Sequence, residues 1–154
     1  MQMKILNSRE IKGLVLGLKE QYAITNIDLN YALLRDEDKV FLISKDYIII
    51  NGLNLRNAGL YFGRIVDDGI ILGIEGSQII GNNALRVIEL NKEETIEWMK
   101  GNDIDAGIRE EGYYLIKNKN DFFGVGKVKN NKVWNMVPRD RRIYNFSSIG
   151  NQSN

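Results

Sequence analysis

Two runs of β-forming residues flank a short acidic turn, and this pattern constrains the fold more than any other stretch of the chain. The runs cover residues 59–66 and 70–74, and Asp67-Asp68-Gly69 lies between them. An Asp-Gly pair between two such runs is a strong hairpin signal, because these residues tolerate the positive φ angles that a tight turn needs. We therefore expect an antiparallel β-hairpin near the middle of the chain.

A helix is predicted ahead of this hairpin. Asn7 can cap its first turn, and Glu10 three residues later completes a capping box. We expect one face of this helix to pack in the core, because apolar side chains recur there at helical spacing, at Ile11, Leu14, Val15, Leu18 and Tyr22. Residues 31–35 and 40–43 are predicted strands, and Gly81-Asn82-Asn83 is the best candidate for a domain boundary.

The second half of the chain predicts a strand, a helix and then three more strands. After the strand at residues 85–90, Asn91 and Glu94 form a second capping box, and Lys100-Gly101 end the helix. The later strands are predicted at residues 112–117, 122–128 and 132–137. A lone helix within a run of short antiparallel strands indicates a small β-barrel.

The chain contains no histidine and no cysteine. It therefore lacks the ligands of a zinc finger and the groups of a Ser-His-Asp or Cys-His catalytic site. Catalysis by carboxylates or lysines would need strongly shifted pKa values, so we expect no enzyme, no cofactor and no metal. A cluster of acidic residues lacks EF-hand spacing and is expected to be a solvated loop; its members are Asp103, Asp105, Glu110 and Glu111.

Three further features bear on location and chemistry. No apolar run approaches the roughly 20 residues that span a bilayer, and residues 1–4 do not resemble a signal peptide. With no cysteine for disulfides, a cytoplasmic setting is expected.

Gly124-Val125-Gly126 does not precede a helix, so we expect it to let a strand bend or approach its neighbour, not to bind phosphate.

Charge is distributed unevenly along the chain. Residues 91–111 hold three basic and seven acidic side chains, a net charge of −4, whereas residues 112–154 hold eight basic and two acidic ones, a net charge of +6. A basic segment with aromatic residues among its charges suits a polyanion partner. Charge alone leaves a second interpretation open, in which this segment is a solvated surface of strands and tail.

The second half also resembles a known RNA-binding domain. Residues 112–116 and 123–127 resemble the PUA-domain pattern, in which one strand is followed by another carrying a small-x-Gly turn. The helix at residues 91–100 and the loop at 101–103 are similar to the PUA helix and the loop after it. This resemblance covers about residues 84–144 and implies a PUA-like β-barrel with one inserted helix.

A resemblance extends to the first half. Residues 40–45 and 59–64 resemble the pre-PUA domain of the Nip-type ribosome-assembly factors. With Lys127 and residues 138–142, the same block is similar to the C-terminal extension of Fmu/Sun-type ribosomal RNA cytosine methyltransferases. Those tails usually carry Lys-Asn before their proline, whereas here Pro138 follows Trp-Asn-Met-Val. No Gly-rich S-adenosylmethionine loop and no cysteine nucleophile occur in the sequence.

The resemblance implies an α+β protein with an α/β pre-PUA-like domain at residues 1–82 and a PUA-like domain at residues 84–154. It implies RNA binding, with ribosomal RNA favoured, in ribosome biogenesis or beside an RNA-modification enzyme. A partner protein would then be an assembly factor or a methyltransferase. One alternative is a transfer-RNA-binding module. Another is a protein-interaction adaptor that uses an exposed N-terminal hairpin and makes no direct RNA contact.

The candidate RNA-binding residues are mostly cations of the C-terminal half. Lys100 and Arg109 flank the loop that, in PUA proteins, helps to grip RNA. Trp134 either stacks on an unpaired base or packs in the core, and the core is favoured because it lies on a predicted strand. Arg64 is interpreted as a surface charge of the hairpin. The complete set is Lys100, Arg109, Lys127, Lys129, Lys132, Trp134, Arg139, Arg141 and Arg142.

Overall fold

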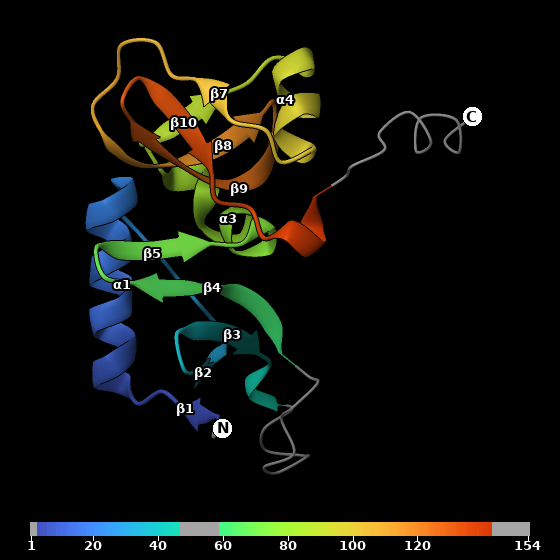
Figure 1. The fold of residues 1–154 in the computed structure, drawn as a ribbon. Coiled ribbons are helices and arrows are strands. Elements are labelled where there is room, and N and C mark those ends of the chain that lie inside the picture. The colour runs from blue at the N-terminus through green and yellow to red at the C-terminus, as the bar shows by residue number, and fades with distance from the viewer. Residues whose placement is uncertain (1–2, 47–58, 143–154) are drawn as a thin grey trace.

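The structure, a computed structural model, describes residues 3–46 and 59–142. Within these residues the strands form two five-stranded sheets, one from each half of the chain. Figure 1 shows one sheet above the other, with helix α1 (Ser8–Tyr22) along one side and the short helix α3 (Ile74–Ile80) between them. The α+β fold predicted from the sequence is confirmed.

The N-terminal sheet is antiparallel throughout, in the order β1-β2-β3-β4-β5. The predicted hairpin is confirmed, because Val66 pairs with Gly69 across the turn between β4 and β5. A register shift between Val40 and Phe41 interrupts the pairing of β3 with β4. The strands are β1 (Lys4–Ile5), β2 (Ala32–Asp36), β3 (Lys39–Ile43), β4 (Leu60–Val66) and β5 (Gly69–Leu72).

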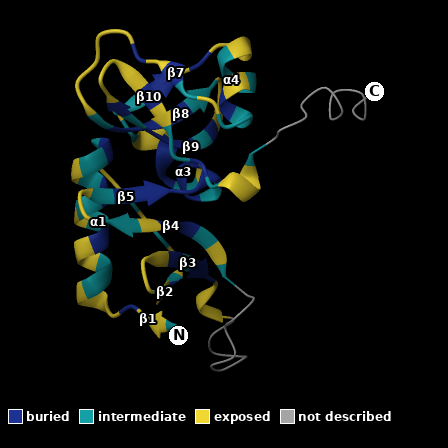
Figure 2. Cartoon of the chain, viewed as in Figure 1, coloured by how far each residue is buried: buried dark blue, intermediate teal, exposed yellow. Residues whose placement is uncertain are grey.

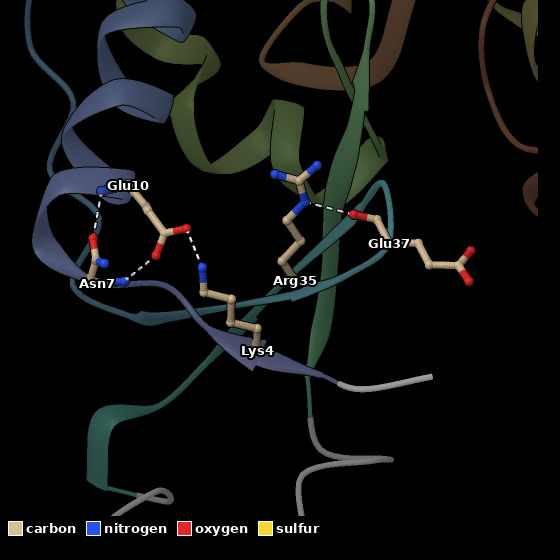
Figure 3. Close-up of polar contacts among 5 residues, drawn as sticks. All are labelled: Lys4, Asn7, Glu10, Arg35 and Glu37. Atoms are coloured by element: carbon tan, nitrogen blue, oxygen red, sulfur yellow. Dashed lines mark hydrogen bonds and ion pairs between the residues drawn. The ribbon is translucent and has the colours of Figure 1, made fainter.

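Helix α1 begins at the capping box that the sequence predicted. The Asn7 side chain accepts a hydrogen bond from the Glu10 amide at 2.9 Å, and the Glu10 carboxylate accepts one from the Asn7 amide at 3.1 Å. Figure 3 shows these contacts, with Lys4 of β1 pairing with Glu10 at 2.7 Å and Arg35 of β2 donating to the Glu37 carbonyl. The helix start is thereby attached to the edge of the sheet.

The C-terminal sheet has the order β6-β8-β9-β10-β7 and curls into a half-barrel. The β6 and β8 strands are parallel, and the other neighbours are antiparallel. The predicted helix is α4 (Lys92–Met99), with the Asn91–Glu94 capping box in place. The strands are β6 (Val87–Glu89), β7 (Ile104–Asp105), β8 (Gly112–Asn118), β9 (Asp121–Lys129) and β10 (Lys132–Asn135).

Two hydrophobic cores lie on opposite faces of β8. Tyr113 and Leu115 pack in a core shared with α1 and the N-terminal sheet. Tyr114 and Ile116 pack in a second core inside the half-barrel, around Trp98 of α4. Successive side chains of a strand point to opposite faces, so β8 separates the two cores. Figure 2 shows buried residues concentrated in α3 and β5, where the two halves meet.

The glycine pair in β9 serves close packing, as predicted. Trp98 is completely buried, and its indole N–H donates to the Phe123 carbonyl at 2.8 Å. A Cβ on Gly126 would lie 2.4 Å from Val133 Cγ1 and 3.0 Å from Trp98 Cη2. Only a glycine lets β9 lie this close to both side chains.

The two halves are joined through their shared core and by an isolated bridge between Ile24 and Ala84. A division into domains at residues 1–82 and 84–154 stays a prediction, and residues 143–154 of the second lie outside the described residues. Between residues 3 and 46 and between 59 and 142, no helix is long and apolar enough to cross a membrane.

Candidate nucleic-acid interface

The predicted cations do not share one environment, and one exposed group of them lies on the β9–β10 hairpin. Lys129 and Lys132 face each other across the turn. The Lys132 ammonium lies 4.6 Å from the centre of the Trp134 ring and 3.4 Å from an Asp103 carboxylate oxygen. The Trp134 indole N–H donates to the Lys129 carbonyl at 3.2 Å. The Trp134 ring and the Lys132 ammonium group therefore lie together at the surface, with Lys129 opposite Lys132 on the neighbouring strand.

The expectation that Trp134 packs in the core is wrong. Its side chain is 41% exposed, whereas its neighbour Val133 is buried inside the half-barrel. The alternation of a strand places only one of two adjacent residues on the core face, and on β10 that residue is Val133. Stacking of Trp134 on a base stays a prediction.

The loop that carries Arg109 lies against this hairpin. The Ala106 amide donates to the Asn131 carbonyl at 3.2 Å, and the Asn130 amide donates to the Glu111 carboxylate at 3.0 Å. Arg109 is exposed, and its Nε donates to the Ala106 carbonyl at 3.1 Å. We name the exposed set Arg109, Lys129, Lys132 and Trp134 the hairpin surface.

Lys127 and Lys100 are held by carboxylates. The Lys127 ammonium lies 2.9 Å from one oxygen of Asp68, and the Tyr113 hydroxyl donates to the other at 2.7 Å. These hydrogen bonds hold the pKa of the Asp68 carboxyl below its usual range, and the same ion pair raises the pKa of Lys127. Lys100 lies 3.6 Å from a Glu97 oxygen. A phosphate would have to displace these carboxylates.

The three arginines after β10 do not form a single cluster in the structure, because Arg141 is held apart from Arg139 and Arg142. Arg141, in the 3-10 turn η2 (Arg139–Arg141), is hydrogen-bonded to the Glu75 carboxylate of α3. The Nε of Arg142 donates to the Val137 carbonyl at 3.0 Å, and its side chain packs against Gly101, whose φ of +96° ends α4. Arg139 is exposed.

Arg139 and Arg142 line a cavity of about 400 Å³ together with Lys39 of β3 and Arg64 of β4. We name this cavity the junction pocket, because both halves of the chain contribute to it. Arg64 was interpreted as a simple surface charge, and Lys39 gave no signal in the sequence. These two residues can be recognised as neighbours only from the register of β3 with β4. That register includes the shift between Val40 and Phe41, which the sequence does not reveal.

Tyr61 of β4 also lines the junction pocket. Burial raises the pKa of its hydroxyl, Arg64 opposes this rise, and the carboxylates of Asp38 and Asp140 add to it. The ring packs edge-on against Phe41, with centroids 5.8 Å apart. The side chain is therefore a fixed, protonated phenol at the wall of the pocket.

The acidic residues of the loop after α4 each bind a different partner. Asp103 accepts a hydrogen bond from the Asn135 amide at 2.8 Å, and Glu110 pairs with Arg86 at 3.5 Å. Glu111 accepts from the Asn130 amide. Over residues 3–46 and 59–142, no three acidic side chains gather in a way that could hold a metal ion. Asp103 and Glu111 thus join the loop to the β9–β10 hairpin, whereas Glu110 joins it to Arg86 ahead of β6.

The comparison with known protein families agrees with this geometry. A family model described as the methyltransferase RsmF PUA domain matches residues 85–143, which include β6 to β10, α4 and η2. A search of the curated proteins found no match. The matched family suggests RNA binding in a methyltransferase-associated context. Residues 85–143 of this chain are thus a PUA domain related to the C-terminal extension of the Fmu/Sun-type methyltransferases.

Proposed function

We propose that this chain is a non-catalytic, cytoplasmic RNA-binding protein that binds structured ribosomal RNA during subunit assembly or beside an RNA-modification enzyme. The observation that carries the proposal is the PUA domain at residues 85–143, which exposes a cationic and aromatic hairpin surface. In this proposal residues 1–82 act as a pre-PUA-like module that supports the barrel and contributes to the RNA site.

The hairpin surface has the chemistry that a nucleic-acid strand requires. Lys129 offers its ammonium group to phosphates and Arg109 adds a guanidinium. A phosphate that reaches Lys132 would have to displace the Asp103 carboxylate, which lies 3.4 Å from its ammonium group. The exposed Trp134 face offers a stacking platform for an unpaired base. Specificity would come from RNA shape and backbone, with a few stacked bases.

A non-catalytic role is supported by the sequence and by the matched family. The chain lacks histidine and cysteine, and the family that matches is an RNA-binding domain. The adaptor alternative relies on an exposed N-terminal hairpin. The β5 side chains Ile70, Ile71 and Leu72 are buried, so on this hairpin the exposed apolar side chain that could meet a partner protein is Leu60 of β4, which is 44% exposed.

The experiment is a fluorescence-anisotropy titration of labelled ribosomal RNA fragments and transfer RNA at two salt concentrations. The test variant is Lys129→Gln/Lys132→Gln, and the matched control is Arg9→Gln/Lys12→Gln on the exposed face of α1. Both variants remove two positive charges. We expect salt-sensitive binding that the hairpin variant weakens and the control preserves.

The preferred RNA separates the two RNA-based roles. Tighter binding of ribosomal RNA fragments supports ribosome assembly, and tighter binding of transfer RNA supports the alternative. Equal weakening by both double variants would show nonspecific attraction and argue against a site on the hairpin. No binding to either RNA would overturn the proposal and favour the adaptor alternative.

A further inference from the structure

The junction pocket concentrates positive charge where the two halves of the chain meet. Lys39 and Arg64 come from neighbouring strands of the N-terminal sheet, and Arg139 and Arg142 come from the segment after β10. Figure 1 shows this segment descending past α3 to the level of β5. Among the described residues, no aspartate or glutamate lines the cavity.

Lys39 and Arg64 are two like charges that lie close together without a carboxylate among the described residues to neutralise them. The two residues lie directly opposite each other between β3 and β4. Like charges in this position destabilise a sheet, and neither side chain forms an ion pair with any described residue. The nearby carboxylates of Asp38 and Asp140 act on Tyr61 from outside the lining. A bound anion would relieve this repulsion.

The pocket is also lined by apolar residues. A phosphate ion would make no favourable contact with them, so the lining suits a ligand that carries an apolar part as well. Residues of β5 and of the segment after β10 line the pocket together with Tyr61: Ile71, Leu72, Met136, Val137 and Pro138. A lining that combines cations with aromatic and aliphatic residues matches the two parts of a nucleotide, its phosphate and its base.

The pocket also lies on a path from the hairpin surface. Strand β10 carries Lys132 and Trp134 at its exposed face, and Asn135, Met136 and Val137 follow directly into the lining. A single strand of RNA that stacks on Trp134 can therefore continue along β10 to the cations of Lys39 and Arg64.

We propose that the junction pocket binds one nucleotide of a single-stranded RNA segment, with the phosphate on Lys39, Arg64, Arg139 and Arg142 and the base against Tyr61 and Pro138. This inference rests on the proposed RNA-binding function and assigns a part of the RNA site to the N-terminal sheet. The PUA domain alone then holds an incomplete site.

The test uses the full chain and a fluorescein-labelled, uridine-rich RNA oligonucleotide that carries one 4-thiouridine. Anisotropy gives Kd at several salt concentrations for wild type, Lys39→Gln/Arg64→Gln, Arg139→Gln and the control Arg9→Gln/Lys12→Gln. We expect the pocket double variant to lower the slope of log Kd against log salt by about 0.7 for each phosphate that it no longer neutralises. Arg139→Gln, which changes an exposed side chain, provides a second variant that should weaken binding without affecting folding.

Thermal unfolding and cross-linking give readouts that a structural role would not produce. Without RNA, Lys39→Gln/Arg64→Gln should melt at the same temperature as wild type or higher, because it removes a like-charge pair. Irradiation of the wild-type complex should cross-link 4-thiouridine to the peptide that contains Tyr61 or Met136. Weaker RNA binding at an undiminished melting temperature, with that cross-link, supports the proposal.

Three outcomes overturn the inference, and they are distinguishable from failure of the proposed function. If wild type binds RNA and both pocket variants bind it equally well, the inference is wrong and the RNA-binding function stands. If uridine monophosphate fills the pocket while RNA binding is unchanged, the site is one for free nucleotides. If wild type binds no RNA, both the function and the inference fail.

Discussion

Asp68 and Lys127, 59 residues apart in the chain, form an ion pair of 2.9 Å that joins the turn between β4 and β5 to strand β9 of the half-barrel. The Tyr113 hydroxyl donates to the second Asp68 oxygen at 2.7 Å, and the Lys127 ammonium lies 5.2 Å from the Tyr113 ring centre. The hairpin tip is thus attached to the PUA domain by three side chains.

We expect Asp68→Asn to lower the free energy of unfolding by less than about 1 kcal/mol, because the pair is partly exposed. Hydrogen bonds from Lys127 and Tyr113 lower the pKa of Asp68, so its stabilisation is present above the unfolded-state pKa of about 3.9 and is lost as pH falls through the folded pKa. Lys127 has a raised pKa, so the stabilisation that it contributes is lost as pH rises through that pKa. Urea unfolding between about pH 3 and 7 measures the loss of the Asp68 contribution at low pH.

The control for this variant is Asp67→Asn in the same turn, whose side chain is exposed and has no ion pair to any described residue. Stability of Asp68→Asn should depend less on pH between about 3 and 5 than that of wild type or the control. An unchanged pH dependence would contradict a role for Asp68 in joining the two halves.

The two tryptophans should respond differently to quenchers and to RNA. Trp98 is completely buried and Trp134 is 41% exposed, so acrylamide should quench Trp134 first. We expect Trp134→Phe to keep the melting temperature and lose most of the quenchable emission. Trp98→Phe should destabilise the protein, because it leaves a gap in the core and an unpaired Phe123 carbonyl.

The fluorescence of the two tryptophans also reports where RNA binds. RNA should quench wild type and Trp98→Phe, which retain Trp134, and should leave the emission of Trp134→Phe nearly unchanged. Quenching that persists in Trp134→Phe would place the RNA away from the hairpin surface.

Replacing glycine by alanine should lower stability where the added Cβ meets other atoms and raise it where the Cβ has free space. A Cβ on Gly126 would lie 2.4 Å from Val133 Cγ1, so Gly126→Ala should cost about 1–3 kcal/mol through overpacking. Gly13 lies inside α1 with nothing within 4 Å of an added Cβ, so Gly13→Ala should stabilise by roughly 0.5–1 kcal/mol. Urea unfolding of both variants measures the difference, and a stable Gly126→Ala would show that β9 has room to move.

The features that sequence predicts well here are those in which the interacting residues are neighbours in the chain. Both capping boxes, at Asn7 and at Asn91, occur as expected, because each needs only a polar side chain and a glutamate three residues later. The β4–β5 hairpin follows from an Asp-Gly turn between two apolar runs. In each case local chemistry alone determines the geometry.

The features that sequence did not reveal depend on distant segments. Strands β1 and β7 have two residues each, too few for a periodic pattern. The exposure of Trp134 depends on which face of β10 meets the half-barrel core. The junction pocket depends on the register of Lys39 with Arg64 and on the approach of residues 139–142 from the far end of the chain.

The edge of the N-terminal sheet gives a last prediction. Gln21 of α1 donates to the Ile70 carbonyl at 2.8 Å and accepts from the Ile70 amide at 2.8 Å. Its side-chain amide thus pairs with edge strand β5 as a neighbouring strand would, and this protects the edge. We expect Gln21→Ala to lose both hydrogen bonds and about 1–2 kcal/mol of stability, at roughly 1 kcal/mol for each bond.

Hydrogen exchange of the Ile70 amide distinguishes this role from simple helix packing. The amide should exchange faster in Gln21→Ala than in wild type, whereas Glu20→Ala, at an exposed neighbouring position of α1, should leave it unchanged. In Gln21→Glu the carboxylate can still accept from the amide but repels the Ile70 carbonyl, so stability should fall while the amide stays partly protected. Equal exchange in all three variants would mean that Gln21 does not hold the edge of β5.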